Sequence, residues 1–332
     1  MQNTAVESTA RLPGLAILAA LVAFLAALLT FLAAVADPLL AIYALIQIVA
    51  GVAMLRRQAW GAYGFALVQV SNAVFMFLIE VRDGTFRHAQ PIVGLVIGLL
   101  LGVLFFFAGR SLAKSGAKRG PVIPWIIVAC LVSIPFVFVK PFAMPSGSME
   151  DTILLGDQIL VRMFPRPSPN RGDIVVFHYP VDRSQIQMKR VIGISGDRIR
   201  IVSGVVYRNG VPLNEPYARH KLGAANRYAN NFPSDPSALR MGLTEALARA
   251  ADMFRNHVVN GEVVIPLGKY FVMGDNRDNS LDSRYWGFLD ESDVMGKPVL
   301  IYNSVDWRYD ESGTKATGIG RIRWNRIGKT VE

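Results

Sequence analysis

Cysteine and histidine are scarce in this 332-residue chain, which has one cysteine and four histidines. The single thiol, Cys130, excludes an intrachain disulfide and a cysteine-based metal site, and its apolar neighbours predict a small buried side chain. No ligand spacing on a helical face is found for the histidines, which are His88, His178, His220 and His257. This scarcity argues against a metalloprotease, and we expect neither a bound metal nor a cofactor.

Sequence signatures of nucleic-acid binding are also missing, although the net charge is +10. The chain has no basic stripe interleaved with aromatic residues, no zinc-finger spacing and no helix-turn-helix pattern. The part after residue 140 shows no internal repeat. We therefore expect no nucleic-acid partner.

Long apolar runs, by contrast, fill the first 140 residues. The composition is 52% hydrophobic and the mean hydropathy is +0.33, which is too high for a water-soluble protein of this size. A spanning helix needs about 20 apolar residues, and five segments are candidates, of which the second and fourth are short. The five segments are residues 12–36, 39–55, 60–79, 92–108 and 122–139. Polar side chains inside them should face neighbouring helices, namely Gln47, Gln69, Ser71 and Asn72.

Basic residues indicate the orientation of these segments. They follow the second and fourth segments, as Arg56, Arg57, Arg110, Lys114, Lys118 and Arg119. Because Lys and Arg collect on the cytoplasmic side, five spans place everything after Lys140 outside. Residues 34–36 (Ala-Val-Ala) resemble a signal-peptide cleavage site, although the apolar run before them is long for one. Whether the first segment is removed therefore stays open.

After residue 140 the pattern changes to short strand-like runs separated by turns. The runs are residues 158–161, 173–177, 189–194, 198–201, 205–207, 263–266, 270–273 and 298–302. Asn209-Gly210 predicts a tight hairpin. Residues 215–262 interrupt the rhythm with a polar loop and one plausible helix, residues 237–254. The predicted fold is an N-terminal multi-span α-helical membrane region (1–139), then a mainly β domain (140–332) with an inserted α+β cap (215–262).

A serine stands in a small turn just beyond the last apolar segment, in Pro145-Ser146-Gly147-Ser148-Met149. Such a turn can present a hydroxyl at close range to a substrate backbone. Serine and glycine are, however, common turn residues for conformational reasons alone. A nucleophile also needs a base, and the chain has neither a G-x-S-x-G elbow nor a convincing His–Asp pair. A lysine is the remaining candidate.

Lys189 opens an apolar run after Met188, so its amine is a candidate for burial. Burial disfavours the ammonium form, and a neutral amine can accept the proton of a serine. Spacing alone still favours an exposed lysine. A third cluster, residues 274–287, is dense in acids, amides and arginines directly after a predicted strand. It misses the calcium-loop spacing, so an internally ion-paired scaffold fits it better.

Together these clusters resemble the bacterial type I signal peptidases, which are Ser–Lys serine proteases with a mainly β catalytic domain. Residues 144–161 resemble the serine box of that family, 172–177 its next strand, 189–199 its lysine box and 274–289 its final Gly-Asp-Asn box. The four boxes occur in the family's order behind a membrane anchor. The long insertion is more similar to Gram-negative members than to the compact Gram-positive ones.

The resemblance implies a role for each matched residue. Ser148 would be the nucleophile and Lys189 the base, with the Ser148 N–H and the Ser146 hydroxyl as the oxyanion hole and Ser280 orienting the amine. Scaffold roles fall to Arg190, Asp275, Asp282 and Arg284. The substrate would bind as an added β-strand, with small residues at P1 and P3 in pockets lined by Phe142, Met144, Pro145, Ile153, Gln187 and Met188.

The resemblance also implies a setting. The partners would be exported preproteins and membrane lipid, and the catalytic domain would lie on the periplasmic side of a bacterial inner membrane. Three features depart from the family: Asp151 stands where proline is usual, five apolar segments exceed the usual one or two, and the insertion has no cysteine pair.

Three alternatives to a general signal peptidase were weighed. A transporter or receptor would need functional charges within the spans, and none is visible in the sequence. An inactive relative would lack Ser148 or Lys189, and both are present. A protease restricted to a few exported substrates stays open, as do the oligomeric state, the lysine pKa and the number of spans.

Overall fold

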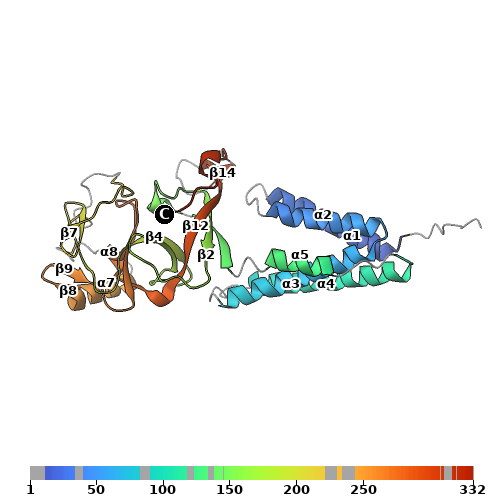
Figure 1. The fold of residues 1–332 in the computed structure, drawn as a ribbon, viewed down its shortest axis with the longest axis horizontal. Coiled ribbons are helices and arrows are strands. Elements are labelled where there is room, and N and C mark those ends of the chain that lie inside the picture. Colours follow the sequence, from blue (N-terminus) through green and yellow to red (C-terminus); the bar gives the residue numbers. More distant parts are fainter. Residues whose placement is uncertain are drawn as a thin grey trace, which may run out of the picture. The chain divides into compact units, whose positions relative to one another are not determined.

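The computed structural model describes residues 12–33, 40–82, 90–117, 123–133, 138–144, 146–220, 230–233, 244–306, 308–309, 316–318 and 320–331. The chain forms two compact units, Met1–Val137 and Phe138–Glu332 (Figure 1). This boundary lies two residues before the one expected from hydropathy, because Val139 begins a half-buried strand and does not end a span. The two units are described separately below.

Helices make up the described part of the first unit. They are α1 (Gly14–Ala33), α2 (Leu40–Leu55), α3 (Ala59–Arg82), α4 (Gln90–Lys114) and α5 (Ile123–Ser133). In α1 the buried stripe consists of small residues, Ala16, Ala19, Ala20, Ala23 and Ala27, whereas large apolar residues such as Leu21 (61% exposed) point outward. This pattern is the inverse of that of a soluble helix and suits a lipid-facing surface.

Small residues also bring α3 and α4 together. A Cβ added to Gly98 would lie 2.3 Å from the Cβ of Ala73, and one added to Gly102 would lie 2.3 Å from a methyl of Val70. Glycine therefore permits a helix contact that any larger residue would prevent.

Polar side chains inside the bundle partly follow the expectation. Gln47 and Gln69 are buried, and the Tyr43 hydroxyl donates to Gln69 Oε1 (2.7 Å). Asn72 lines a small cavity beside them. Ser71, however, donates to the carbonyl of Val68 in its own helix (3.1 Å) and not to a neighbouring helix.

Two of the described helices are long and apolar enough to cross a membrane, Ala59–Leu78 and Ile92–Lys114. The apolar parts of α1 and α2 are shorter, Gly14–Thr30 and Ala41–Leu55. The described part of α5 has 11 residues. Residues 34–36, with the suspected cleavage site, lie outside the described residues. The structure therefore supports two of the five expected spans by length.

Cys130 departs from the sequence prediction. It was expected to be buried, but it is exposed on α5. The reason is its place on the helix: α5 packs through Trp125 and Ala129, and the next residue along points about 100° away from that face.

The second unit is built on a seven-stranded antiparallel sheet in the order β1-β2-β12-β3-β4-β10-β11. The strands are β1 (Val139–Ala143), β2 (Asp157–Arg162), β3 (Ile174–His178), β4 (Ile186–Gly193), β10 (Lys269–Met273), β11 (Leu289–Asp290) and β12 (Val294–Ser304). In β2 every second residue is buried, whereas β3 is buried along its whole length. Strand β3 therefore lies in the centre of the core, as its continuous apolar run predicts.

A smaller sheet has the order β7-β6-β5-β9-β8. Its strands are β5 (Arg198–Val202), β6 (Val205–Arg208), β7 (Val211–Pro212), β8 (Val258–Val259) and β9 (Glu262–Val264). Positive φ at Asn209 (55°) and Gly210 (79°) confirms the predicted hairpin between β6 and β7. The end of the predicted cap thus belongs to this sheet, because β9 pairs with β5.

The helix of the cap is α7 (Thr244–His257). It ends three residues later than expected, and residues 237–243 of the predicted helix lie outside the described residues. Short elements complete the unit: the 3₁₀ turn η1 (Gly147–Met149), α8 (Ser283–Trp286), η4 (Glu291–Asp293), the pair β13 (Arg308–Tyr309) and β14 (Ala316–Gly318), and η5 (Trp324–Arg326).

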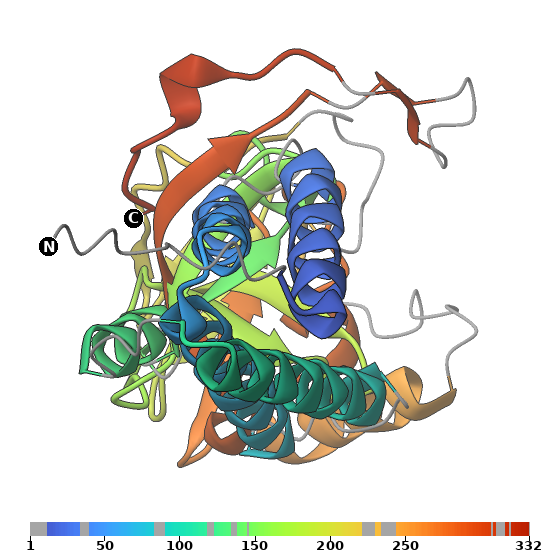
Figure 2. The ribbon, with the colours of Figure 1, turned by 90° about the vertical axis from the view of Figure 1, so that its right-hand side faces the viewer.

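The segment that follows β14, residues 320–331, runs back beside β12, as the red ribbon in Figure 2 shows. Gly328 N–H donates to Ile301 O (2.8 Å) and Ile301 N–H donates to Lys329 O (2.9 Å). This segment is therefore hydrogen-bonded to the sheet.

Candidate active site

Ser148 lies at the centre of the turn η1 and is 6% exposed. Residues 274–287 contain the sequence Gly274-Asp275-Asn276, and we call them the Gly-Asp-Asn cluster. Asn276 of this cluster holds the turn through two hydrogen bonds. Its backbone N–H donates to Ser148 O (3.1 Å), and its side-chain Nδ2 donates to Gly147 O (3.1 Å). Two segments that are 128 residues apart in the sequence, at Ser148 and Asn276, are thus hydrogen-bonded at the serine.

Lys189 lies on β4 and is 3% exposed, so it is buried and not a surface lysine. Its Nζ donates to Ser148 Oγ (2.9 Å) and to Met188 O (3.2 Å). Burial lowers the pKa of Lys189 from 10.5 to about 8, even though the negative charge of Asp282 acts in the other direction. A substantial fraction of the amine is therefore neutral near pH 8.

Ser146 is next to the same oxygen. Its Oγ is 3.2 Å from Ser148 Oγ, and either hydroxyl can be the donor. The structure thus places Ser146 and Lys189 next to Ser148 Oγ, the arrangement that the family resemblance implied.

Gly274 allows the Ser280 loop to approach the serine turn. A Cβ at this position would be 2.5 Å from Ser148 O and 2.3 Å from Ser280 Oγ. The Ser280 hydroxyl is buried, and it lies close enough to Asp282 to help lower the pKa of that carboxyl. Among the described residues Lys189 makes no hydrogen bond to Ser280, so the structure does not show the predicted orienting contact.

The four predicted scaffold residues form two buried ion pairs. Arg190 Nε and Nη2 donate to the two oxygens of Asp275 (2.8 and 2.7 Å). Arg284 Nε and Nη2 donate to the two oxygens of Asp282 (2.8 and 2.8 Å). Burial alone would raise the pKa of Asp282, but Arg284, the Gly274 N–H and Ser280 together outweigh it, so the pKa lies below its usual value. Asp282 also accepts from Gly274 N–H (3.1 Å), so this pair holds the glycine beside Ser148.

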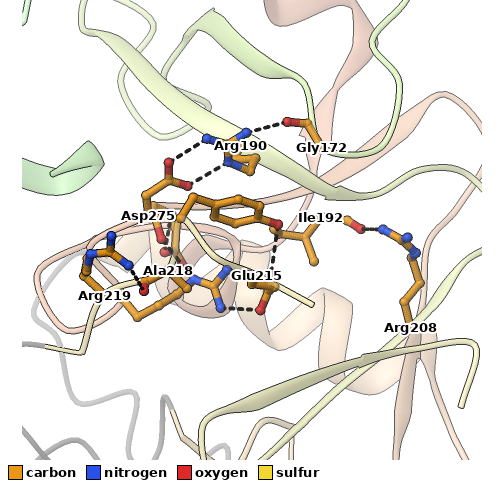
Figure 3. Close-up of polar contacts among 12 residues, drawn as sticks. Gly172, Arg190, Ile192, Arg208, Glu215, Ala218, Arg219 and Asp275 are labelled. Carbon is orange, nitrogen blue, oxygen red and sulfur yellow. Dashed lines mark hydrogen bonds and ion pairs between the residues drawn. The ribbon is translucent and has the colours of Figure 1, made fainter. Parts of the chain in front are cut away.

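Residues 215–219, which we call the strap, lie across the Gly-Asp-Asn cluster (Figure 3). The Arg219 N–H donates to Asp275 O (2.7 Å), and Arg277 N–H donates to Arg219 O (2.9 Å). Glu215 accepts two bonds from the buried Arg277 (2.8 and 2.6 Å). The guanidinium of Arg190 lies over the Tyr217 ring, with Arg190 Cζ 3.9 Å from the ring centroid.

Sequence reasoning missed the strap, because its residues follow neither helical nor strand periodicity. The Asp151 position, where the family usually has proline, also contacts the strap. Asp151 pairs with Arg219 (3.1 Å) in an exposed ion pair. In the sequence, the only signal that could have predicted the strap was the local density of charged and aromatic residues in Glu215-Pro216-Tyr217.

A second missed contact comes from residues 320–331. Arg326 forms an ion pair with the buried Asp157 (2.5 Å) and donates to Thr152 O (2.9 Å). Arg323 donates to Leu155 O (2.6 Å). These arginines therefore hold the loop that follows Ser148.

A groove of about 410 Å³ lies beside Ser148 and Lys189. Its lining residues are Phe142, Ala143, Met144, Ser146, Ser148, Val176, Gln185, Ile186, Gln187, Met188, Lys189, Asn279 and Leu281. Four of the six predicted substrate-binding residues are among them. Ile153 is not, since it is fully buried in the core beneath Met144 and Met188. Pro145 lies outside the described residues.

Unpaired strand edges border the groove on both sides. Among the described residues β1 pairs only with β2, and Met144 N–H donates to Asp157 O (3.0 Å). Because bonded pairs alternate, the N–H and C=O of Ala143 point away from β2. Pro141, which lacks an N–H, occupies the same outward position, as expected at an edge.

The other edge is the first half of β4. Strand β10 pairs with β4 only from Arg190 to Gly193. Tyr179 N–H donates to Gln185 O (2.8 Å), so the same alternation turns the backbone groups of Ile186 and Met188 away from β3. Strands β1 and β4 are separated by three strands yet line one groove, so the sheet is curled.

Comparisons with known proteins agree with this site. Residues 120–303 match the family described as "Signal peptidase, peptidase S26". The chain is 33% identical over 254 residues to signal peptidase I of Buchnera aphidicola subsp. Acyrthosiphon pisum (strain APS), covering 61% of this chain and 78% of that protein. It is 30% identical over 245 residues to signal peptidase I of Aquifex aeolicus (strain VF5), covering 62% and 96%.

A crystal structure of a signal peptidase I from Enterococcus faecalis V583 aligns with 40% of this chain and 97% of that chain, at 30% identity and a TM-score of 0.26. The family match covers more than half of the chain and includes Ser148, Lys189 and the Gly-Asp-Asn cluster. The chain therefore belongs to the S26 family of signal peptidases.

Proposed function

We propose that this protein is a type I signal peptidase that removes N-terminal signal peptides from exported preproteins, cutting after small residues at P1 and P3. Ser148 is the nucleophile and Lys189 the general base of this proposal. The observation that carries it is the 2.9 Å contact between a buried lysine amine and Ser148 Oγ.

The chemistry follows from the charge state of Lys189. When the amine is protonated it donates to Ser148 Oγ, as in the structure. When it is neutral, its lone pair can accept the serine proton while Oγ attacks the scissile carbonyl. The ammonium then protonates the leaving amine, and an acyl-enzyme on Ser148 remains. Water activated by the neutral amine hydrolyses this ester.

The developing oxyanion needs donors that are already in place. We assign this role to the Ser148 N–H and the Ser146 hydroxyl, and the 3.2 Å separation of the two serine oxygens supports the second assignment. Ser280 is proposed to assist the lysine. Its buried hydroxyl lies beside Asp282 and beside Gly274, the glycine that also approaches Ser148 O.

The groove supports binding of the substrate as an added strand. The outward backbone groups of Ala143 lie on one side and those of Ile186 and Met188 on the other. An extended peptide between them can pair with both edges. Phe142, Met144 and Met188 leave shallow apolar space, which favours small side chains at P1 and P3.

The membrane setting is part of the proposal. We divide the chain into a membrane region (1–139), a catalytic domain (140–332) and a cap (215–262). The apolar helices would cross the bacterial inner membrane several times and contact lipid, with the catalytic domain on the periplasmic side. The outward-facing leucines of α1 support contact with lipid.

Cleavage of a preprotein whose signal ends in Ala-x-Ala tests the function. The full chain in detergent should cut after the signal, and Ser148→Ala and Lys189→Met should lose at least about 10³-fold in kcat while remaining folded. Ser292→Ala and Lys329→Met are matched controls, because both side chains are exposed and should leave the rate unchanged. Cleavage by both dyad variants at the wild-type rate would disprove the Ser–Lys mechanism.

A further inference from the structure

One contact between the strap and the loop that follows Ser148 has no part in the mechanism above. Arg219 Nε forms an ion pair with Asp151 Oδ2 (3.1 Å), and Asp151 follows Ser148 by three residues. The two side chains are 45% and 53% exposed, so the pair contributes little to the stability of the fold. What the pair can affect is the position of the loop, and with it the position of the nucleophile.

Arg219 is held in place on its own side of the pair, although its side chain is exposed. Its N–H donates to Asp275 O (2.7 Å), and its carbonyl accepts from Arg277 N–H (2.9 Å). Its guanidinium Nη1 donates to Pro216 O (2.9 Å) and to Ala218 O (3.1 Å), as Figure 3 shows for Ala218. Because these bonds already order the side chain, it loses little further freedom when Nε binds a carboxylate.

Asp151 is the exposed residue of a loop that is otherwise anchored in the core. Met149 and Ile153 are fully buried, and Ile153 N–H donates to Met149 O (2.8 Å). Between them, Thr152 Oγ1 donates to Asp275 Oδ2 (2.5 Å). The ion pair of Asp151 therefore restrains the segment that comes directly after the nucleophile.

Asp151 stands where the signal peptidase family usually has proline. The ring of a proline fixes φ at about −65° and so restricts the backbone covalently. Aspartate lacks this restriction, and in this chain the carboxylate at the same position is bound by the ordered guanidinium of Arg219. An ionic restraint thus stands where the family has a covalent one.

We propose that Arg219 is a positioning residue for the reaction, which holds Ser148 in place through its ion pair with Asp151. Because salt weakens an exposed ion pair, this restraint makes kcat fall as ionic strength rises. Neither Asp151 nor Arg219 lines the groove, so the effect belongs to kcat and not to KM. This inference rests on the proposed peptidase function and deepens it by naming a regulation of the same site.

A double-mutant cycle in the full chain in detergent tests this. The variants are Arg219→Met, Asp151→Asn, the two together, and Asp151→Pro with and without Arg219→Met. The matched control is Arg200→Met, since Arg200 is 43% exposed and its carboxylate partner, Glu262, is 3.6 Å away. We measure kcat and KM for an Ala-x-Ala preprotein at about 0.05 M and about 1 M salt, and thermal unfolding of each variant.

At low salt Arg219→Met and Asp151→Asn should each lower kcat about threefold with KM unchanged, and the double variant should lose no more than either. In the Asp151→Pro background Arg219→Met should have no effect. High salt should lower kcat of the wild type and of Arg200→Met about threefold, and should leave kcat of Asp151→Asn and Asp151→Pro unchanged.

Additive losses in the cycle would mean that Arg219 acts through the strap carbonyls alone, and they would overturn the inference. An unchanged kcat in Arg219→Met, or an equal loss in the proline background, would overturn it as well. The Asp151→Asn cycle decides the matter even where the proline variant does not fold. A wild type that cuts no preprotein would instead overturn the peptidase function, which separates that failure from this one.

Discussion

Burial sets the chemistry of Lys189. The amine is removed from water, and the nearest charges act in opposite directions: Asp282 and Asp275 favour the ammonium, whereas Arg284 disfavours it. The two buried acids are each paired with an arginine, so their effect on the lysine is reduced. The result is a base that is mostly protonated at pH 7 and mostly neutral at pH 9.

The pH dependence of cleavage should report this amine. Because only the neutral form accepts the serine proton, kcat/KM should rise about tenfold per pH unit below a pKa of about 8 and level off above it. The measurement is initial cleavage rate at subsaturating preprotein from pH 6 to 10. A rate that stays flat between pH 6 and 9 would contradict a lysine base with this pKa.

Gly274 gives a steric prediction at the same scale. In Gly274→Ala the new methyl would meet Ser148 O at 2.5 Å and Ser280 Oγ at 2.3 Å. Displacement of the serine turn by a fraction of an ångström should lower kcat about 10²-fold with a smaller change in KM. Gly94→Ala is the control, since a Cβ there meets nothing within 4 Å. Equal activity of the two variants would show that the turn tolerates the shift.

The sequence singled out Ser148 and Lys189 only through the resemblance of four boxes in order, because a Ser-Gly-Ser turn is common for conformational reasons and spacing alone favoured an exposed lysine. It could not predict that Asn276 binds the serine turn, since that contact joins segments far apart in the chain. Ile153 was misplaced for a related reason: its apolar character fits both a groove wall and the core beneath it.

At the scale of elements, the strap is the start of the predicted cap and contacts the segment that holds Ser148. Glu215 and Arg277 form a buried ion pair with side chains 8% and 1% exposed. Arg277 is separated by one residue from Asp275 and lies next to Asn276, which holds Ser148. The strap is therefore connected to Ser148 through Arg277 and Asn276.

The variant Glu215→Gln tests whether the strap supports the position of Ser148. The change leaves the buried guanidinium of Arg277 without its counter-charge, and we expect a loss of about 3 kcal/mol in the free energy of unfolding together with a reduced kcat. Glu262→Gln is the matched control, because its pair with Arg200 is partly exposed and 3.6 Å long. Thermal unfolding and cleavage rate are measured on both. A variant as stable as the control would mean that the strap is dispensable.

Regular elements were predictable where a local rule applies. The Asn209-Gly210 turn needs positive φ at both positions, and alternating or continuous apolar runs marked β2 and β3. Strand β1 was not predicted, because Val139 at a half-buried sheet edge has the same apolar character as the end of a span. The strap has no periodicity, so its pairing depends entirely on tertiary contacts.

For the whole molecule, the question is how many times the chain crosses the membrane. Hydropathy counts apolar residues and predicts five spans, whereas helix length in the described residues supports two. The two criteria differ most at α1 and α2, which are apolar but whose apolar parts are short. The number of spans decides on which side the basic residues after α2 lie.

The single cysteine makes this testable. In a Cys130→Ser background, Arg57→Cys and Val202→Cys place one thiol after α2 and one at the exposed last residue of β5. With intact cells and an impermeant maleimide applied from the periplasmic side, we expect labelling at residue 202 and none at residue 57 until the membrane is opened. Labelling of both from outside would contradict the proposed orientation.

The contact of residues 320–331 with the loop that follows Ser148 has a consequence for folding during synthesis. Arg323 and Arg326 are synthesised after Ser148, Lys189 and the Gly-Asp-Asn cluster, yet they hold Thr152, Leu155 and Asp157 in place. A nascent chain that already contains Ser148 and Lys189 therefore lacks the arginine contacts to the loop after Ser148. The hydrogen bonds and the ion pair that hold this loop therefore cannot form until translation has passed Arg326.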